Sequence, residues 1–240
     1  MRLACEGGPA FVALQELAAG TLDRLVAWSG YASHGVVASR PRLPRGLAIA
    51  LTDLAPTLLR SAVEGQANAI LVAPGIRVLE HHRVVLNPRR FRKRVGEELD
   101  LGLHARLSWA RERRVGHAVR AALPDGRTMV VANLHATSYR GDKRLADAEL
   151  LRAATFADGL AAPGEPVVLA GDFNVTVVSS PTLRALSTPE WGFSPAGPGL
   201  DHVLVRGLTV TVPERHLPET FREHDGALLS DHAPVEMEVE

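Results

Sequence analysis

Polar residues follow short apolar runs at several places in the sequence, and their types could do chemistry. Gly171-Asp172-Phe173-Asn174 comes directly after the apolar run 166–170. Asp172 and Asn174 are two residues apart, so in extended backbone they share one face. A carboxylate and an amide on one face can bind a cation, orient a water molecule or hold a phosphoryl oxygen. The alternative, a plain turn after a strand, is the commoner meaning of an isolated Asp-x-Asn.

A second cluster, Ser230-Asp231-His232-Ala233-Pro234, lies near the end of the chain. Adjacent residues of a strand point to opposite faces, so Asp231 and His232 can serve one site only from a loop. Pro234 favours a loop because proline resists the middle of a sheet. The alternative is an Asx-type turn with an exposed histidine.

Three weaker signals also stand at the ends of apolar runs. His135, in Asn133-Leu134-His135, could contact a phosphate or protonate a leaving oxygen. Asp201, which precedes His202, could hold an imidazole in one tautomer. Glu16, after Gln15, is a fair metal ligand. Taken singly, each is more often an ordinary surface, turn or core residue.

The elements that must position these residues can be predicted from hydrophobic periodicity. Pro124-Asp125-Gly126 predicts a hairpin turn between two of the strands, and 201–205 with 208–212 suggests another strand pair. Asp142 could cap a helix whose apolar stripe comprises Leu145, Ala148, Leu151 and Ala154. Strands near both ends with helices between them favour an α/β sandwich. The expected strands are 11–16, 68–73, 76–86, 115–122, 128–133, 166–170, 201–205, 208–212 and 235–239, the expected helices are 47–62 and 142–160, and 87–114 is expected to be a polar, Arg-rich connection.

Composition limits the class of protein. The chain has 240 residues, of which 46% are hydrophobic, and this suits one domain over 1–240. Its formal net charge is zero, so no global field attracts nucleic acid or membrane. The single Cys5 excludes an internal disulfide and a cysteine-rich metal site. No apolar run approaches the roughly 18–20 residues of a membrane span, and the start lacks the pattern of a signal peptide. We therefore expect a cytoplasmic protein and a monomer.

Together, the clusters follow the order Gln-Glu, Asn-x-His, Gly-Asp-x-Asn, Asp-His, Ser-Asp-His. From Phe11 to the C-terminus this order resembles the endonuclease/exonuclease/phosphatase superfamily, which has the deoxyribonuclease-I-like fold. Gly-Asp-Phe-Asn and Ser-Asp-His-Ala-Pro-Val are its most specific marks. The resemblance implies a four-layer α/β sandwich, with two mixed sheets face to face, helices outside and the active site at one end.

The same resemblance assigns a divalent cation, Mg²⁺ or Mn²⁺, to Glu16 and Asp231. Hard oxygen ligands suit Mg²⁺. Such a cation neutralises charge that builds on phosphoryl oxygens and lowers the pKa of bound water.

The catalytic roles implied by the resemblance fall on six residues. Asp172 would position or deprotonate the attacking water, Asn174 would hold a phosphoryl oxygen, and His135 would contact the phosphate. His232, together with Asp231, would complete the metal and phosphate site, with Asp201 orienting its ring. The choice of general base stays open between Asp172 and His232.

The N-terminus departs from the family pattern, which begins with a strand ending in Asn and a helix before the strand that carries the metal-binding Glu. Only ten residues precede Phe11, and a parallel crossover needs a dozen or more. We therefore expect residues 1–5 to be the last turn of that helix, ended by Gly7 and Gly8. On this interpretation the first strand and its Asn are lacking, with weaker metal binding and stability.

The substrate is less well defined by the sequence. Arg-rich segments at 89–94 and 111–114 could bind a nucleic-acid backbone or be a solvated loop. Trp109 and Trp191 are either stacking platforms or core residues. Three hypotheses follow: a nuclease or related phosphodiesterase, a phosphomonoesterase or lipid-headgroup phosphodiesterase on the same fold, and a non-catalytic protein that keeps the fold.

Overall fold

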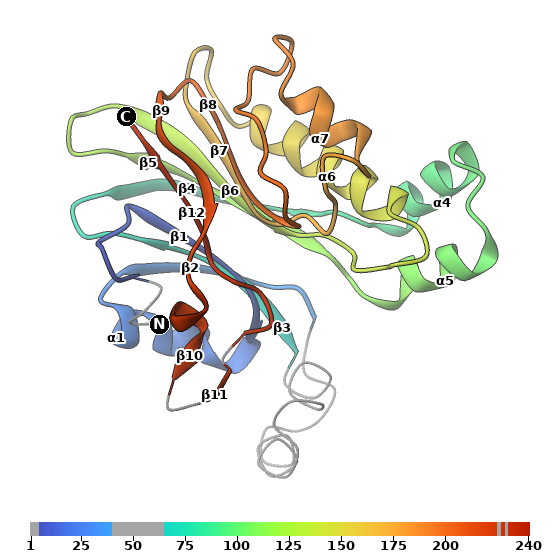
Figure 1. The fold of residues 1–240 in the computed structure, drawn as a ribbon, viewed down its shortest axis with the longest axis horizontal. Helices are drawn as coiled ribbons and strands as arrows, with labels where there is room; N and C mark the ends of the chain where they lie inside the picture. The colour runs from blue at the N-terminus through green and yellow to red at the C-terminus, as the bar shows by residue number, and fades with distance from the viewer. Residues whose placement is uncertain (1–4, 40–64, 225–226, 229) are drawn as a thin grey trace.

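The computed structural model describes residues 5–39, 65–224, 227–228 and 230–240. The expected helix at 47–62 and most of the segment 1–5 lie outside these residues. In chain order the elements are β1 (Phe11–Ala18), η2 (Ala19–Arg24), α1 (Leu25–Ser29), β2 (Ala32–Val37), β3 (Gln66–Val72), β4 (Arg77–Val85), α4 (Arg89–Glu98), α5 (Leu103–Arg111), β5 (Val115–Ala122), β6 (Thr128–His135), α6 (Arg144–Asp158), β7 (Val167–Asp172), α7 (Pro181–Leu186), β8 (Asp201–Arg206), β9 (Val210–His216), η3 (Glu219–Arg222), β10 (Glu223–His224), β11 (Ala227–Leu228) and β12 (Val235–Val239) (Figure 1).

The largest sheet has five strands in the order β4-β5-β6-β7-β8. Strands β6 and β7 run parallel, and the other neighbours are antiparallel. The register sets His135 of β6 opposite Asp172 of β7, and Asp172 opposite Asp201 of β8. Three of the candidate site residues therefore lie on adjacent strands at one end of this sheet.

Helices α6 and α7 cover one face of the five-stranded sheet. The buried face of α6 includes Ala146, Leu150, Ala153 and Ala157, which pack on apolar residues of β6, β7 and β8. The stripe expected from the sequence was wrong in part, because Leu151 is 46% exposed. Spacings of three and four residues fit two adjacent stripes of a helix, and the contact with the sheet decided between them.

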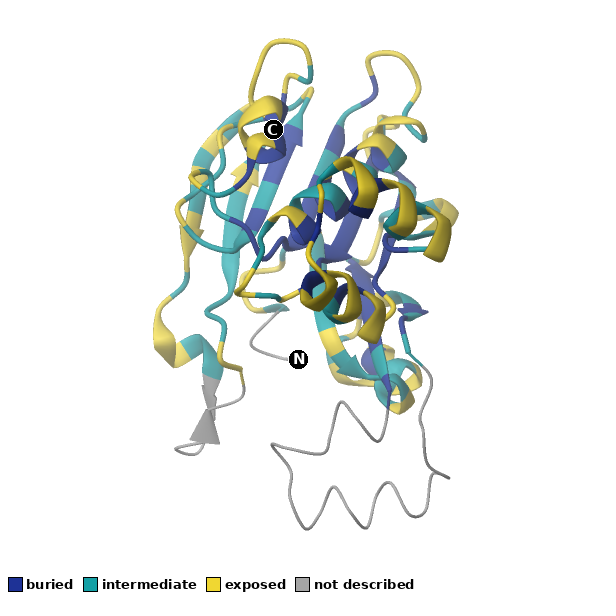
Figure 2. Ribbon diagram, turned by 90° about the vertical axis from the view of Figure 1, so that its right-hand side faces the viewer, coloured by how far each residue is buried: buried dark blue, intermediate teal, exposed yellow. Residues whose placement is uncertain are grey.

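A three-stranded antiparallel sheet, in the order β1-β3-β2, covers the opposite face. Ile70 and Val72 of β3 pack against Val119 of β5 and Val131 of β6. Leu25 of α1 packs on the other side of this small sheet, against Ala69 and Leu71. The expected α/β class is confirmed. In Figure 2, buried residues concentrate on the strands and exposed ones on the outer helices and loops.

The segment 87–114 is not the irregular connection that its polarity suggested. It forms a pair of helices, α4 and α5, which enclose a small core of Val95, Leu101, Ala105 and Trp109 with Leu145 of α6. These apolar residues are widely spaced among charged ones, and only the contact with α6 brings them together. Trp109 is 1% exposed, so it is a core residue rather than a stacking platform.

Strands β8 and β9 are not paired with each other, contrary to expectation. β8 pairs with β7, and β9 pairs with β12. Backbone N–H groups on the outer edge of β8 donate to side chains instead of to a neighbouring strand. Val203 N donates to Glu214 Oε2 (2.6 Å), and Val205 N donates to Ser194 Oγ (3.1 Å). The other expected strands are present, with ends shifted by a few residues. Within the described residues, no helix is long and apolar enough to cross a membrane.

Candidate active site

Residues from several distant clusters meet at the end of the five-stranded sheet where β6 and β7 finish. His135 Nε2 lies 3.4 Å from Asp172 Oδ2 and 3.8 Å from Glu16 Oε1. Glu16 belongs to β1, in the three-stranded sheet. The site therefore lies where the two sheets meet.

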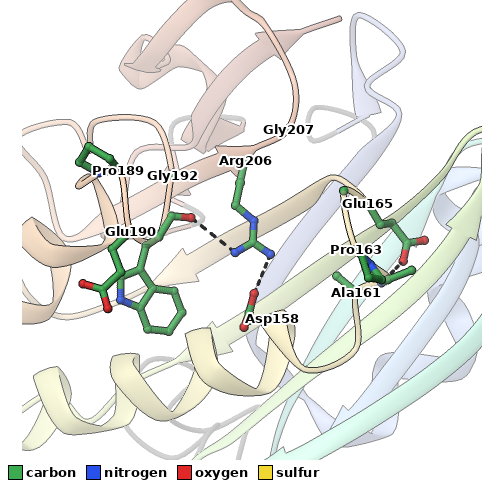
Figure 3. A pocket seen from close by; sticks show the side chains of 12 residues that line it. Asp158, Ala161, Pro163, Glu165, Pro189, Glu190, Gly192, Arg206 and Gly207 are labelled. Atoms are coloured by element: carbon green, nitrogen blue, oxygen red, sulfur yellow. Dashed lines mark hydrogen bonds and ion pairs between the residues drawn. The ribbon is translucent and has the colours of Figure 1, made fainter.

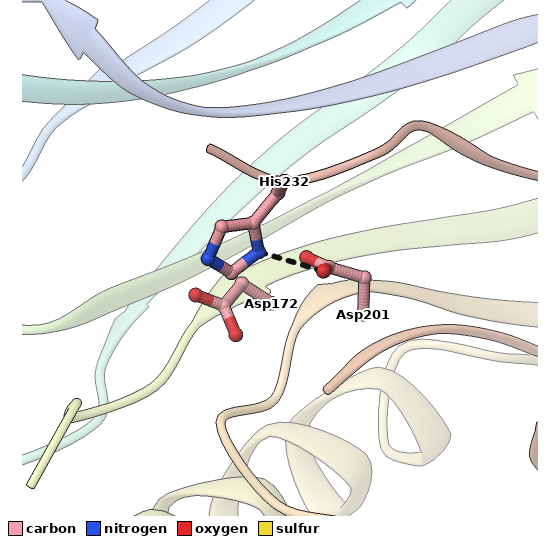
Figure 4. A group of neighbouring side chains, drawn as sticks. All are labelled: Asp172, Asp201 and His232. Atoms are coloured by element: carbon pink, nitrogen blue, oxygen red, sulfur yellow. Dashed lines mark hydrogen bonds and ion pairs between the residues drawn. The ribbon is translucent and has the colours of Figure 1, made fainter. Parts of the chain in front are cut away.

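The loop before β12 adds an imidazole to this group. His232 Nδ1 donates to Asp201 Oδ2 at 2.7 Å, which is the hydrogen bond that the sequence suggested. Figure 4 shows the Asp172 carboxylate beside the same ring. Asp172, Asp201 and His232 each offer a ligand atom within 4.8 Å of the others, so they could hold a metal ion. Asp231 is not part of this trio: it is exposed, and its backbone carbonyl accepts from Arg222.

The Gly-Asp-x-Asn motif has a local reason for its residues. Gly171 has φ +134°, and a Cβ there would lie 2.0 Å from the Leu134 carbonyl oxygen, so only glycine fits. Asn174 adopts φ 55°, which is uncommon outside glycine, and its N–H donates to Asp172 Oδ1 at 2.9 Å. Its side-chain nitrogen donates to Asp172 Oδ2 (2.8 Å) and to the Ala136 carbonyl (3.1 Å). Asn174 therefore fixes the Asp172 carboxylate.

Glu16 is also held in an uncommon backbone conformation. Its φ is 55°, and its side chain is 59% exposed toward the solvent. The preceding Gln15 donates to Asn133 Oδ1 at 2.7 Å, and Asn133 Nδ2 donates to the Leu14 carbonyl at 3.0 Å. These bonds join β1 to β6 and set Glu16 beside His135. Strained non-glycine residues such as Glu16 and Asn174 often mark functional sites.

Burial and the neighbouring charges shift the pKa values of Asp172 and His232. Burial raises the pKa of Asp172 to about 6, and the negative charge of Asp201 acts in the same direction, while His232 opposes them. Burial by itself would lower the pKa of His232, but its hydrogen bond to Asp201 and the surrounding carboxylates leave it raised. A carboxylate whose pKa lies near neutrality can act as a general base.

Arg114, which the sequence analysis named only as part of the Arg-rich segment 111–114, lies against His135. Its Nη1 is 3.0 Å from His135 Nδ1 and 3.1 Å from Nε2, so the guanidinium faces the imidazole ring. Burial, followed by the charge of Arg114, lowers the pKa of His135 well below its usual value. Arg114 is 6% exposed, and within the described residues its Nε has no hydrogen-bond partner. The sequence feature that could have identified this role of Arg114 is its position directly before the apolar run 115–122.

Two further basic side chains hold the backbone that follows the motif. Lys143 Nζ donates to the Asn174 carbonyl at 2.8 Å, and His202 Nε2 lies 3.0 Å from the Val175 carbonyl. The other ring nitrogen of His202 lies 3.3 Å from the buried Glu214 carboxylate. Burial would lower the pKa of His202, but its bonds to Glu214 and to the Val175 carbonyl leave it raised. Lys143 stands in no motif, and the Asp201-His202 cluster pointed to Asp201 rather than His202, so sequence reasoning missed both roles.

A pocket of about 520 Å³ lies elsewhere, between the end of α6 and the loop after α7 (Figure 3). It is lined by Trp191 and by the ion pair of Arg206 with Asp158, whose atoms are 2.7 Å apart. Arg206 pairs with Val167 at the opposite end of β7 and β8 from the Asp172–Asp201 pair. Trp191 is therefore not a platform beside the candidate active site.

Comparisons with known proteins agree with this geometry. Solved structures with the same fold include humanised D. rerio TDP2 (TM-score 0.62, 13% identity, covering 97% of this chain and 85% of that one). The human Nocturnin catalytic domain is similar as well (TM-score 0.59, 14% identity, 96% and 81% covered). So is the mannosyl-6-phosphatase Bt3783 of Bacteroides thetaiotaomicron (TM-score 0.62, 14% identity, 100% and 88% covered). No curated protein sequence matches the chain.

The sequence profile of the Endonuclease/Exonuclease/phosphatase family matches residues 6–232. This match spans every cluster that meets at the end of the five-stranded sheet. The chain is a phosphoesterase that belongs to the endonuclease/exonuclease/phosphatase family.

Proposed function

We propose that the protein is a divalent-metal-dependent phosphodiesterase that directs a water molecule at phosphorus from the side opposite the leaving oxygen. The observation that supports this most is the group of Asp172, His232 and Asp201 beside His135 and Arg114. It combines a carboxylate that can accept a proton, an oriented imidazole and a buried guanidinium. Phosphoryl transfer requires positioning and charge stabilisation of this kind.

The residues divide these tasks. Asp172, held by both N–H donors of Asn174, orients the water and accepts its proton. His232, held by Asp201, is the alternative base and can donate to a phosphoryl oxygen. Both side-chain hydrogens of Asn174 are already engaged, so Asn174 acts by positioning Asp172 rather than by holding a phosphoryl oxygen.

The phosphate itself is bound by a buried pair, Arg114 directly before β5 and His135 at the end of β6. The neutral His135 ring donates one N–H to a phosphoryl oxygen, and Arg114 supplies positive charge beside it. The unpartnered Nε of Arg114, among the described residues, is a further donor for an anion.

The carboxylates fit a divalent cation. Asp172 and Asp201 offer hard oxygen atoms within 4.8 Å of each other, and Glu16 lies 3.8 Å from His135. After burial, the negative charges of Asp201 and Glu16 contribute to the raised pKa of Asp172. Asp201 and His232 are close because of their own hydrogen bond, so their closeness is weaker support for a metal site. The proposed ligand is Glu16, as the family resemblance implies, and Asp172 is kept as the base. Binding by Asp231 stays a prediction from the family resemblance. When bound, Mg²⁺ or Mn²⁺ neutralises charge on the phosphoryl oxygens.

The decisive assay compares bis-(p-nitrophenyl) phosphate with p-nitrophenyl phosphate in Mg²⁺, Mn²⁺ or EDTA. We expect faster hydrolysis of the diester, dependence on the metal, and a loss of roughly 100-fold or more in Asp172→Asn. Asp125→Asn is the matched control, because Asp125 lies in the exposed β5–β6 turn. Preference for the monoester would favour a phosphomonoesterase, and no turnover of either would favour a non-catalytic homologue.

Finer expectations accompany this proposal. The described contacts support a single domain over 1–240 arranged as the four-layer sandwich, with α1 outside the small sheet and α6 outside the large one. We retain a cytoplasmic, monomeric protein as a hypothesis. Nuclease activity, suggested by the Arg-rich segments, is also a hypothesis. The first of these segments lies on α4, so the surface of α4 and α5 is relevant to this hypothesis.

A further inference from the structure

The outward face of α5 is unusual for a helix that packs on a protein. Its inward face carries Ala105 and Trp109, which are buried. On the other side, Leu103 is 71% exposed and Leu107 is 60% exposed. Leu103, Leu107 and Arg111 are four residues apart in turn, so they form one stripe opposite the buried pair.

The same helix pair concentrates positive charge in a chain that has no net charge. Segment 87–114 has nine basic and four acidic residues, and the chain as a whole is balanced. Some of the basic groups are engaged: Arg94 pairs with Glu98, and Arg106 donates to the Leu101 carbonyl. Others are exposed and, in the part of the chain that the structure describes, form no ion pair, namely Arg89, Arg90, Lys93 and Arg111.

This surface lies at the same end of the molecule as the candidate active site. Arg114, three residues after α5, contacts His135. Tyr139, four residues beyond His135, packs against the core of the helix pair, and Arg144 Nη1 donates to the Leu99 carbonyl at 2.8 Å. In Figure 1 the two helices project beyond the sheets at this end.

We propose that the outward face of α4 and α5 is a docking surface for an anionic lipid bilayer. Exposed leucines with a cation on the same stripe, here Arg111, and further exposed cations on the neighbouring helix α4 are a combination that binds such a surface. The cations meet lipid phosphates and the leucines enter the apolar layer. Leu103 and Leu107 have the exposure and spacing to insert together.

A nucleic acid would use the cations but not the leucines. Single-stranded nucleic acid also needs aromatic platforms. On these helices Trp109 is buried, and Phe91 is half-buried with the guanidinium groups of Arg94 and Arg152 over its ring. The surface therefore fits a bilayer better than a nucleic acid.

Docking would bring the active site to the headgroup region. The class of substrate that this location supplies is a phospholipid headgroup phosphodiester, and this consequence rests on the proposed function. The docking itself does not, because it involves none of the residues placed in the catalytic group.

The test is co-sedimentation with vesicles of phosphatidylcholine alone or mixed with phosphatidylserine, in EDTA, for the full chain and for Asp172→Asn. We expect both proteins to bind the mixed vesicles, more weakly as salt rises, and to bind phosphatidylcholine little. The double variant Leu103→Gln/Leu107→Gln should bind at least about tenfold more weakly. Arg89→Gln/Arg90→Gln should lose on the order of tenfold or more.

Two controls come from the opposite end of the five-stranded sheet. Leu79→Gln removes a leucine that is 43% exposed on β4, and Arg77→Gln removes an exposed cation at the start of that strand. Neither should change vesicle binding. The helix variants replace exposed side chains, and unchanged circular dichroism would show that they fold.

The proposal would be overturned if Leu103→Gln/Leu107→Gln bound vesicles as tightly as the unchanged protein, or if neutral and anionic vesicles bound equally well. Tight binding of single-stranded DNA that depends on Arg89 and Arg90, with no vesicle binding, would identify a nucleic-acid surface instead. Because binding is measured without metal or turnover, failure of the phosphodiesterase assay leaves this result intact.

Discussion

At the scale of single residues, the site depends on side chains that hold one another. Asp201 accepts from His232, and Asn174 donates to both oxygens of Asp172. Each pair fixes the orientation of one side chain of the candidate site, the imidazole of His232 or the carboxylate of Asp172. Such positioning is worth as much to catalysis as the reacting group itself, because a misoriented base loses most of its effect.

Replacing Asp201 by Asn should therefore lower kcat by roughly 100-fold to 10,000-fold while the protein stays folded. The asparagine lacks the negative charge that helps to raise the pKa of His232, so that pKa should fall. Steady-state kinetics and an NMR titration of the ring would measure both effects. Asp158→Asn, at the far end of the sheet beside Arg206, is the control and should leave both unchanged. An unaltered kcat in Asp201→Asn would remove its orienting role.

At the scale of elements, a buried carboxylate joins α5, α6 and the end of β6. Glu149 of α6 is fully buried and accepts from Trp109 Nε1 at 2.6 Å, from Thr137 N at 2.6 Å and from Thr137 Oγ1 at 2.8 Å. Thr137 follows His135 by two residues. Glu149 therefore fixes the backbone that leaves the catalytic strand, and it ties that backbone to the helix pair that we propose docks on membranes.

Glu149 predicts a particular dependence of stability on pH. Burial raises the pKa of Glu149 to about 7 from its ordinary value of 4.5, although its three hydrogen bonds oppose this. A carboxyl with a raised pKa contributes stability below its unfolded pKa and loses it as pH rises through the folded value. Relative to Glu149→Gln, the wild-type free energy of unfolding should fall by on the order of 3 kcal/mol between about pH 4.5 and pH 7. Urea unfolding at several pH values would test this, and parallel curves for the two proteins would contradict it.

At the scale of the whole molecule, the candidate active site brings together residues from separate sheets. Glu16 comes from the three-stranded sheet, while His135, Asp172 and Asp201 come from the five-stranded sheet. His232 lies just before β12, which pairs with β9 outside both sheets. A cation held between these carboxylates would relieve their repulsion and cross-link the sheets.

Divalent metal should therefore raise the melting temperature. An ion present at 100 times its Kd stabilises the folded state by about 2.7 kcal/mol. In a domain of this size that corresponds to roughly 5 to 10 °C. Thermal melts in Mn²⁺, Mg²⁺ and EDTA would measure the shift, and Glu16→Gln should reduce it. Equal melting temperatures in metal and EDTA would show that these carboxylates do not form a metal site.

By itself, the sequence determined the class of fold, the family and the motifs that meet at one end of the five-stranded sheet. Periodicity placed β5, β6 and β12 because those strands are continuous runs whose pattern depends on neighbours in the chain. The Gly-Asp-x-Asn motif could be recognised because Gly171 has no substitute beside the Leu134 carbonyl.

Only the tertiary structure decided what depends on residues far apart in the chain. The pairing of β8 with β7 rather than β9, and the helices within 87–114, required partners that no local pattern contains. Arg114 acquires its place from contact with His135, twenty-one residues away. The exposed leucines of α5 look like core residues in the sequence, because hydrophobicity tells which residues avoid water and not which faces find a partner.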